Sequence, residues 1–226
     1  KDLVVTTGFP RDLTDKDWTS FKVKAEGSFS SDKVIINTAP ELKIPNLAFE
    51  QTGDVKFVKR TNWLPEIPSF SSGAACADLD NDGDLDYVVN NINDKAFILR
   101  NTTEEKSEGK VHYIKIRLIG KPGNTMGINA KVELWDQGKY QYIEHFLTRG
   151  YASSVDPVVH FGLAGDDLVD SIKVIWPAGR TISVIKNIKG DQTIEINEKD
   201  SRPSTNYSSY PEKEKLLFTR LDNVID

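Results

Sequence analysis

The densest group of side chains able to do chemistry is a run of carboxylates near the middle of the chain. It reads Asp78-Leu79-Asp80-Asn81-Asp82-Gly83-Asp84-Leu85-Asp86, with five acids in nine residues. A cation among them relieves their mutual repulsion most simply. Oxygen ligands at alternating positions, with a glycine at the sixth that lets the backbone turn, are what Ca²⁺ requires. The sequence therefore predicts a calcium site.

Each acid has an expected role at this site. Side-chain oxygens are expected from four of the acids: Asp78, Asp80, Asp82 and Asp86. Asp84 occupies the seventh position and is expected to offer its backbone carbonyl. A solvated acidic turn without a metal is the alternative, and five acids around one glycine favour calcium.

The residues around the loop decide which kind of calcium site it is. An EF-hand needs a bidentate Glu at position twelve and a helix after it, whereas position twelve is Val89 and Tyr87-Val88-Val89 favours a strand. The small residues 73–77 suit a tightly packed strand before the loop. The loop is therefore expected to join two strands.

Other constellations offer little chemistry. No two of the three histidines stand at the helical i, i+4 spacing that, with a Glu, a zinc site needs; they are His112, His145 and His160. Ser153, Ser154 and Asp156 lack a Gly-x-Ser-x-Gly elbow, and turn residues explain them. We therefore predict no catalytic residue, no residue that binds an organic cofactor, and a non-enzymatic protein.

The aromatic residues of the second half have two interpretations. Four of them are considered: Trp135, Tyr140, Tyr142 and Trp176. Because aromatic rings pack on sugar faces, these four could form a glycan-binding platform. Burial of the four in a core made by the strands is the favoured alternative. The single cysteine, Cys76, has small apolar neighbours that predict a buried core thiol.

The overall composition narrows the class of partner. The chain has 226 residues, 38% hydrophobic and 28% charged, with a formal charge of −5, as in soluble globular proteins. The negative balance and the lack of a basic stripe with aromatic residues argue against a nucleic-acid partner. No apolar run reaches the ~20 residues of a membrane span. The remaining partners are calcium and a protein or glycan ligand.

A short internal repeat links the acidic loop to the start of the chain. Residues 2–7, Asp-Leu-Val-Val-Thr-Thr, resemble residues 86–91, Asp-Tyr-Val-Val-Asn-Asn. Asp2 would be the ninth-position ligand of a second loop whose other residues lie upstream. Repeats of this kind are typical of propeller-like arrays. We therefore expect a fragment of a longer protein.

The pattern of apolar, polar and turn-forming residues changes along the sequence and divides the chain into three parts. Residues 1–106 form a repeat region with a helical insert at about 10–45, where Thr14 and Asp17 resemble a capping box and helices are expected near 15–25 and 31–38. Residues 107–198 show period-two alternation and regular turns, which predict an all-β sandwich or barrel. Residues 199–226 are expected to be a linker and the start of a further unit.

These motifs resemble a known combination of domains. Residues 72–86 resemble FG-GAP or VCBS repeats, as in integrin-like β-propellers. The segments 127–134, 149–154, 160–163 and 174–180 resemble the ASPIC/UnbV domain that accompanies such repeats in the cartilage acidic protein-like family and in bacterial surface proteins. The resemblance maps metal ligands onto Asp78, Asp80, Asp82, Asp84 and Asp86.

The resemblance also implies a fold and a setting. The expected fold is mainly β, with partial β-propeller-like blades, a small helical insert and a sandwich-like or barrel-like second domain. The implied location is extracellular or at the cell surface, where calcium is abundant. The expected function is calcium-dependent recognition or adhesion, and the alternative is a carbohydrate-binding accessory component of a polysaccharide-processing system. Two blades do not close a propeller.

Overall fold

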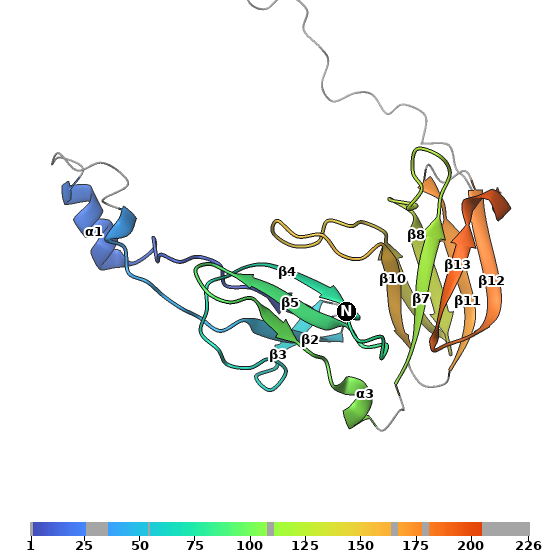
Figure 1. Ribbon diagram of the computed structural model, residues 1–226, viewed down its shortest axis with the longest axis horizontal. Helices are drawn as coiled ribbons and strands as arrows, with labels where there is room; N and C mark the ends of the chain where they lie inside the picture. The colour runs from blue at the N-terminus through green and yellow to red at the C-terminus, as the bar shows by residue number, and fades with distance from the viewer. Residues whose placement is uncertain are drawn as a thin grey trace, which may run out of the picture. The chain divides into compact units, whose positions relative to one another are not determined.

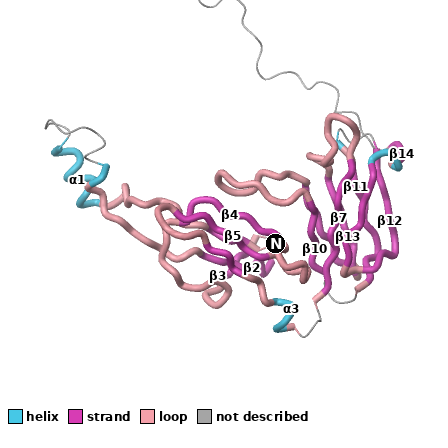
Figure 2. Tube along the Cα trace, viewed as in Figure 1, coloured by secondary structure: helices cyan, strands magenta, loops and turns pink. Residues whose placement is uncertain are grey.

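The chain forms several small β-sheets. The computed structural model describes residues 2–25, 36–53, 55–107, 111–163, 167–177 and 181–204. Within these ranges the fold is mainly β, and no sheet closes into a barrel (Figure 2). The chain divides into two compact units. The first comprises Lys1–Tyr113 with Phe146–Pro157, and the second comprises Ile114–His145 with Val158–Asp226.

The first unit contains two antiparallel three-stranded sheets (Figure 1). One is built from β1 (Leu3–Val5), β2 (Leu47–Gly53) and β3 (Lys56–Lys59). The other is built from β4 (Ser71–Ala77), β5 (Asp86–Asn91) and β6 (Phe97–Leu99). The acidic loop joins β4 to β5, so the prediction that it links two strands is confirmed.

The internal repeat has the same pairing in both sheets. Leu3 lies opposite Phe49 in β1–β2, and Tyr87 lies opposite Leu99 in β5–β6. An aspartate at the start of each segment, directly before β1 and at the first position of β5, accepts a hydrogen bond on its Oδ1 from the partner segment. Asp2 accepts from the backbone N–H of Gln51 at 3.0 Å, and Asp86 from that of Asn101 at 2.8 Å. Repeated sequence is therefore accompanied by repeated local geometry.

The insert after β1 contains the helix α1 (Lys16–Ala25). Its capping residue differs from the expected Thr14: the Asp15 carboxylate accepts the Trp18 backbone N–H at 2.7 Å, while Thr14 bonds to Asp12. A short helix, α3 (Thr103–Lys106), follows β6. The helix expected at 31–38 lies largely outside the described residues. Within them, no helix is long and apolar enough to cross a membrane.

The second unit is a sandwich of two sheets. The smaller has the order β10–β7–β13, from Val158–Leu163, His112–Ile119 and Gln192–Asn197, with β7 and β13 parallel. The larger has the order β14–β12–β11–β8–β9, from Arg202–Pro203, Thr181–Lys189, Leu168–Ile175, Lys131–Asp136 and Lys139–Glu144. The 3₁₀ turn Glu198–Asp200 leads into β14, so the domain continues to Pro203 and not only to residue 198.

One hydrophobic core joins these two sheets. Alternation predicts the buried residues of β7, β8 and β11 correctly, and each is at most 2% exposed: Ile114, Ile116, Leu118, Val132, Leu134, Ile172, Val174 and also Trp176. On β12, Val184 is 36% exposed and Ile185 packs against the core. Ser183 faces Trp176 and accepts its indole N–H at 2.9 Å.

The hairpin 146–157 joins the first unit, although the sequence places it within 107–198. Its two arms are held by the bridge Thr148–Ser154 and by the bond from the Val155 N–H to the Leu147 carbonyl, 2.8 Å. Its tip lies against Gly73 of β4, where an added Cβ would be 3.0 Å from the Tyr151 carbonyl oxygen. A tight contact made possible by a glycine is a tertiary feature that strand alternation does not encode.

Candidate functional site

The acidic loop is folded by its own carboxylates. Asp78 Oδ2 accepts the Gly83 N–H at 3.0 Å, and Asp82 Oδ1 accepts the Asp84 N–H at 2.9 Å. The backbone turns through left-handed conformations at Asn81 (φ 63°) and Gly83 (φ 99°). Asparagine and glycine tolerate such angles best, so the loop sequence matches the loop geometry.

Three of the five predicted ligands are brought together. Asp78, Asp80 and Asp82 each offer one carboxylate oxygen, and these atoms lie within 4.8 Å of one another. Oxygen ligands stand 2.3–2.6 Å from Ca²⁺, so ligands on opposite sides of one ion are about 5 Å apart. The three carboxylates are therefore close enough to hold one metal ion. Elsewhere in the described residues, no group of three His, Cys, Asp or Glu side chains comes as close.

The other two predicted ligands lie deeper. Asp86 is 2% exposed, and its two oxygens accept the Leu79 N–H at 3.0 Å and the Asn101 N–H at 2.8 Å. This carboxylate ties the start of the loop to the segment after β6. Asp84 is 9% exposed. Neither belongs to the close group of three.

A positively charged side chain, that of Arg100, also contacts the three clustered aspartates. Arg100, directly after β6, places Nε 2.8 Å from Asp80 Oδ2 and Nη2 3.5 Å from Asp82 Oδ2. Nη2 is also 2.9 Å from Glu105 Oε1. The hydrogen bond to Asp80, followed by the charge of Glu105, raises the pKa of Arg100 above its ordinary value. The guanidinium offsets part of the loop's negative charge on one side.

An aromatic ring also packs on the loop, at Gly83. A Cβ added at Gly83 would lie 2.1 Å from Cε1 of Tyr113, so the ring of Tyr113 packs directly on this glycine. The sequence interpretation missed both Arg100 and Tyr113. Each lies 17 or more residues from the loop centre, and only the strand pairing brings them close. The position of Arg100 at the end of the strand that pairs with β5 is the one signal that was available.

The remaining candidates are distributed over the second unit. Trp176 is 1% exposed and belongs to the core, as the favoured interpretation states. Trp135, Tyr140 and Tyr142 instead lie on the outer face of the larger sheet, because the alternate residues of β8 and β9 form its core face. Tyr140 is 54% exposed. Cys76 is half-buried, and burial raises the pKa of its thiol.

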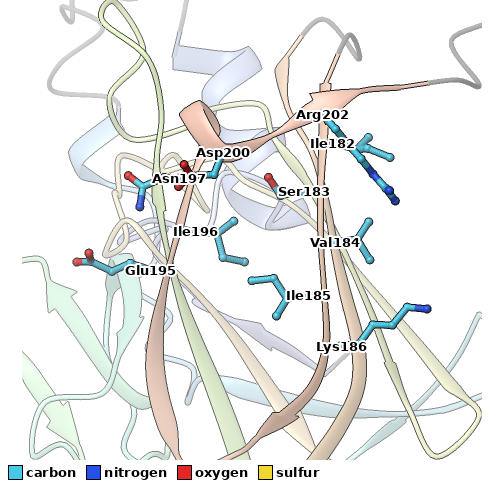
Figure 3. A pocket seen from close by; sticks show the side chains of 10 residues that line it. All are labelled: Ile182, Ser183, Val184, Ile185, Lys186, Glu195, Ile196, Asn197, Asp200 and Arg202. Carbon is cyan, nitrogen blue, oxygen red and sulfur yellow. The ribbon is translucent and has the colours of Figure 1, made fainter.

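A groove of 510 Å³ opens on the side of the sandwich between β12 and β13 (Figure 3). Ile185 and Ile196 lie between the two strands, and Lys186 points away from them. The rim carries charges of both signs, from Lys186, Arg202, Glu195 and Asp200. Here β13 is an edge strand, and β14 covers only Thr181 and Ile182 of β12, so the groove is the open side of the sandwich.

Comparison with known proteins identifies one domain. Residues 120–203 match the family model described as ASPIC and UnbV. This segment runs from the turn after β7 to β14 and includes the hairpin 146–157. The resemblance of the second half to that family is therefore supported. Among curated proteins, none matches the chain.

Proposed function

We propose that this chain is a calcium-stabilised recognition or adhesion module that acts outside the cell or at its surface without catalytic turnover. One observation carries the proposal: the carboxylates of Asp78, Asp80 and Asp82 converge within 4.8 Å on a loop whose backbone is already turned at Gly83. A bound Ca²⁺ would cross-link the loop between β4 and β5. The fold with its repeated strand pairing suits an FG-GAP or VCBS array.

The calcium site is tested by titration of the full chain. Binding to the folded state alone raises stability by about 2.7 kcal/mol when free Ca²⁺ is 100 times Kd. Millimolar Ca²⁺ should therefore raise the melting temperature by several degrees, and calorimetry should detect one site. Asp82→Asn keeps the oxygen that accepts the Asp84 N–H and removes the charge, so the response should be lost.

Two further variants sharpen this test. Asp94→Asn is the matched control, because Asp94 also accepts a neighbouring backbone N–H, that of Lys95, but lies outside the loop. It should leave the calcium response unchanged. Arg100→Gln removes the cation beside Asp80 and Asp82 and should tighten calcium binding severalfold. The proposal is wrong if ~10 mM Ca²⁺, far above the range of extracellular calcium sites, changes neither heat nor melting temperature.

A second candidate function is a carbohydrate-binding accessory component of a polysaccharide-processing system. The outer-face position of Trp135, Tyr140 and Tyr142 favours it, since aromatic ring faces pack on sugars and Tyr140 is 54% exposed. This role does not depend on the acidic loop. Binding that persists after calcium is chelated would separate it from the first candidate.

A further inference from the structure

The larger sheet of the second unit carries an aromatic surface on its solvent side, formed by Trp135 of β8 with Tyr140 and Tyr142 of β9. Trp135 lies directly opposite Tyr140 in the ladder, with ring centroids 5.3 Å apart and ring planes tilted by 51°. Tyr142 follows on the same side of β9, about 6.7 Å further along the strand. Because β9 is an edge strand, no further strand of the described residues pairs beside this aromatic surface.

Polar groups lie on the same face of the sheet, beside the rings. Glu133 lies opposite Tyr142 in the ladder, and its Oε2 is 2.9 Å from Lys173 Nζ of β11. Loss of solvent around Tyr140, followed by the charge of Glu133, raises the pKa of the Tyr140 hydroxyl above its ordinary value. The surface thus combines ring faces with carboxylate, ammonium and hydroxyl groups.

We infer that this aromatic surface binds a neutral saccharide. The C–H groups on one face of a pyranose ring carry partial positive charge and pack on the negative face of an aromatic ring, while its hydroxyls need hydrogen-bonding partners at the edge. The ion pair of Glu133 with Lys173 leaves the polar groups beside the rings electrically balanced, which is complementary to an uncharged ligand. The inference rests on the second candidate function and is independent of the calcium site.

A cross-strand aromatic pair also stabilises a sheet without any ligand, and the surface has features that this role does not require. Tyr140 keeps 54% of its area exposed, so much of the ring is available. The Glu133–Lys173 pair lies in the next row of the same face, because Lys173 is the ladder partner of Glu133. Stabilisation alone needs only the Trp135–Tyr140 contact.

The test titrates the full chain with neutral hexasaccharides of glucose, mannose and xylose, and with anionic hexagalacturonate for comparison. At least one neutral probe should bind with a Kd of ~1 mM or below, weak but measurable by calorimetry. Tyr140→Ala should weaken that binding about tenfold, the effect of one lost ring contact. Tyr140→Phe should retain most of it. Chelation of calcium should leave it unchanged, which distinguishes this inference from the calcium proposal.

One control variant and one further test variant accompany this experiment. Tyr151→Ala removes a tyrosine that is 76% exposed on the hairpin of the first unit and should not alter binding. Glu133→Gln keeps the shape of the side chain and should weaken binding without changing the circular dichroism spectrum. The inference is overturned if no neutral probe binds, if only hexagalacturonate binds, or if Tyr140→Ala lowers the melting temperature and leaves binding intact.

Discussion

Gly83 is the residue on which the geometry of the acidic loop depends. Its φ of 99° belongs to the region that L side chains rarely adopt, and the Tyr113 ring occupies the place of a Cβ. Two separate costs therefore oppose any side chain here, a backbone cost and a steric one. Gly123 shares the backbone angle, φ 95°, but nothing lies within 4 Å of its absent Cβ.

The two glycines allow these costs to be measured separately. Gly123→Ala should destabilise the chain by about 1–2 kcal/mol, the cost of a left-handed residue. Gly83→Ala should cost a further 1–3 kcal/mol or so, since the Tyr113 ring must move. Urea unfolding in the absence of calcium measures both variants. Equal losses would show that the ring contact is unimportant.

Tyr87 gives a second test at the residue scale. Burial, followed by the charge of the neighbouring Cys76, raises the pKa of Tyr87 from 10.0 to about 12. The unfolded chain loses this proton first, so the contribution is fully present below pH 10 and is lost as the pH rises toward 12. The free energy of unfolding should fall by about 1–3 kcal/mol over that window. Tyr87→Phe should lack this part of the decline, and an unchanged profile would contradict the assignment.

The sequence predicts those parts of the site that are local. Alternating carboxylates around a glycine at the sixth position place Asp78, Asp80 and Asp82 together, and the structure has this arrangement. Asp86 was expected as a ligand, and its carboxylate accepts two backbone N–H groups. One of these donors, the Asn101 N–H, lies in the segment after β6 and reaches Asp86 only because that segment folds back to the loop. The spacing of residues within the loop does not predict this contact.

At the scale of elements, β12 shows how a strand departs from strict alternation. Ile185 and Ile188 both face the core although they are three residues apart. Asn187 between them is left-handed, with φ 53°, and the paired strand β11 shows the same spacing between Val169 and Ile172. Residues of the two strands change faces together, so their register is preserved. Ile182 and Val184 share one face of β12, as their period-two spacing predicts, and it is the face opposite to that of Ile185 and Ile188.

Asn187 lends itself to a test because its side chain is exposed and substitutions act mainly through the backbone. Asn187→Gly should change the free energy of unfolding little, since glycine accepts a positive φ. Asn187→Val should cost about 1–2 kcal/mol or more, because a β-branched residue is strained there. Chemical denaturation of both variants measures the difference. Equal stability of the two would refute a backbone role for this residue.

At the scale of the whole molecule, the order of the chain and the order of the units differ. The chain leaves the second unit after His145, forms the hairpin 146–157 as part of the first unit, and returns at Val158. Residues 120–203, which match the ASPIC and UnbV family, therefore include a segment that packs with β4. A linear division of the sequence at 106/107 could not anticipate this exchange.

The hairpin should therefore respond to a change in the first half of the sequence. In Gly73→Ala the new Cβ would lie 2.8 Å from Ser153 Oγ and 3.0 Å from the Tyr151 carbonyl oxygen, so the tip must shift. The Val155 N–H, bonded to the Leu147 carbonyl, should exchange with deuterium about tenfold faster, as about 1.4 kcal/mol of local stability is lost. Amides of β11 should keep their protection. Gly162→Ala adds a methyl group where no atom lies within 4 Å and should leave the hairpin unchanged. Equal exchange in the two variants would mean that the hairpin is held by its own arms alone.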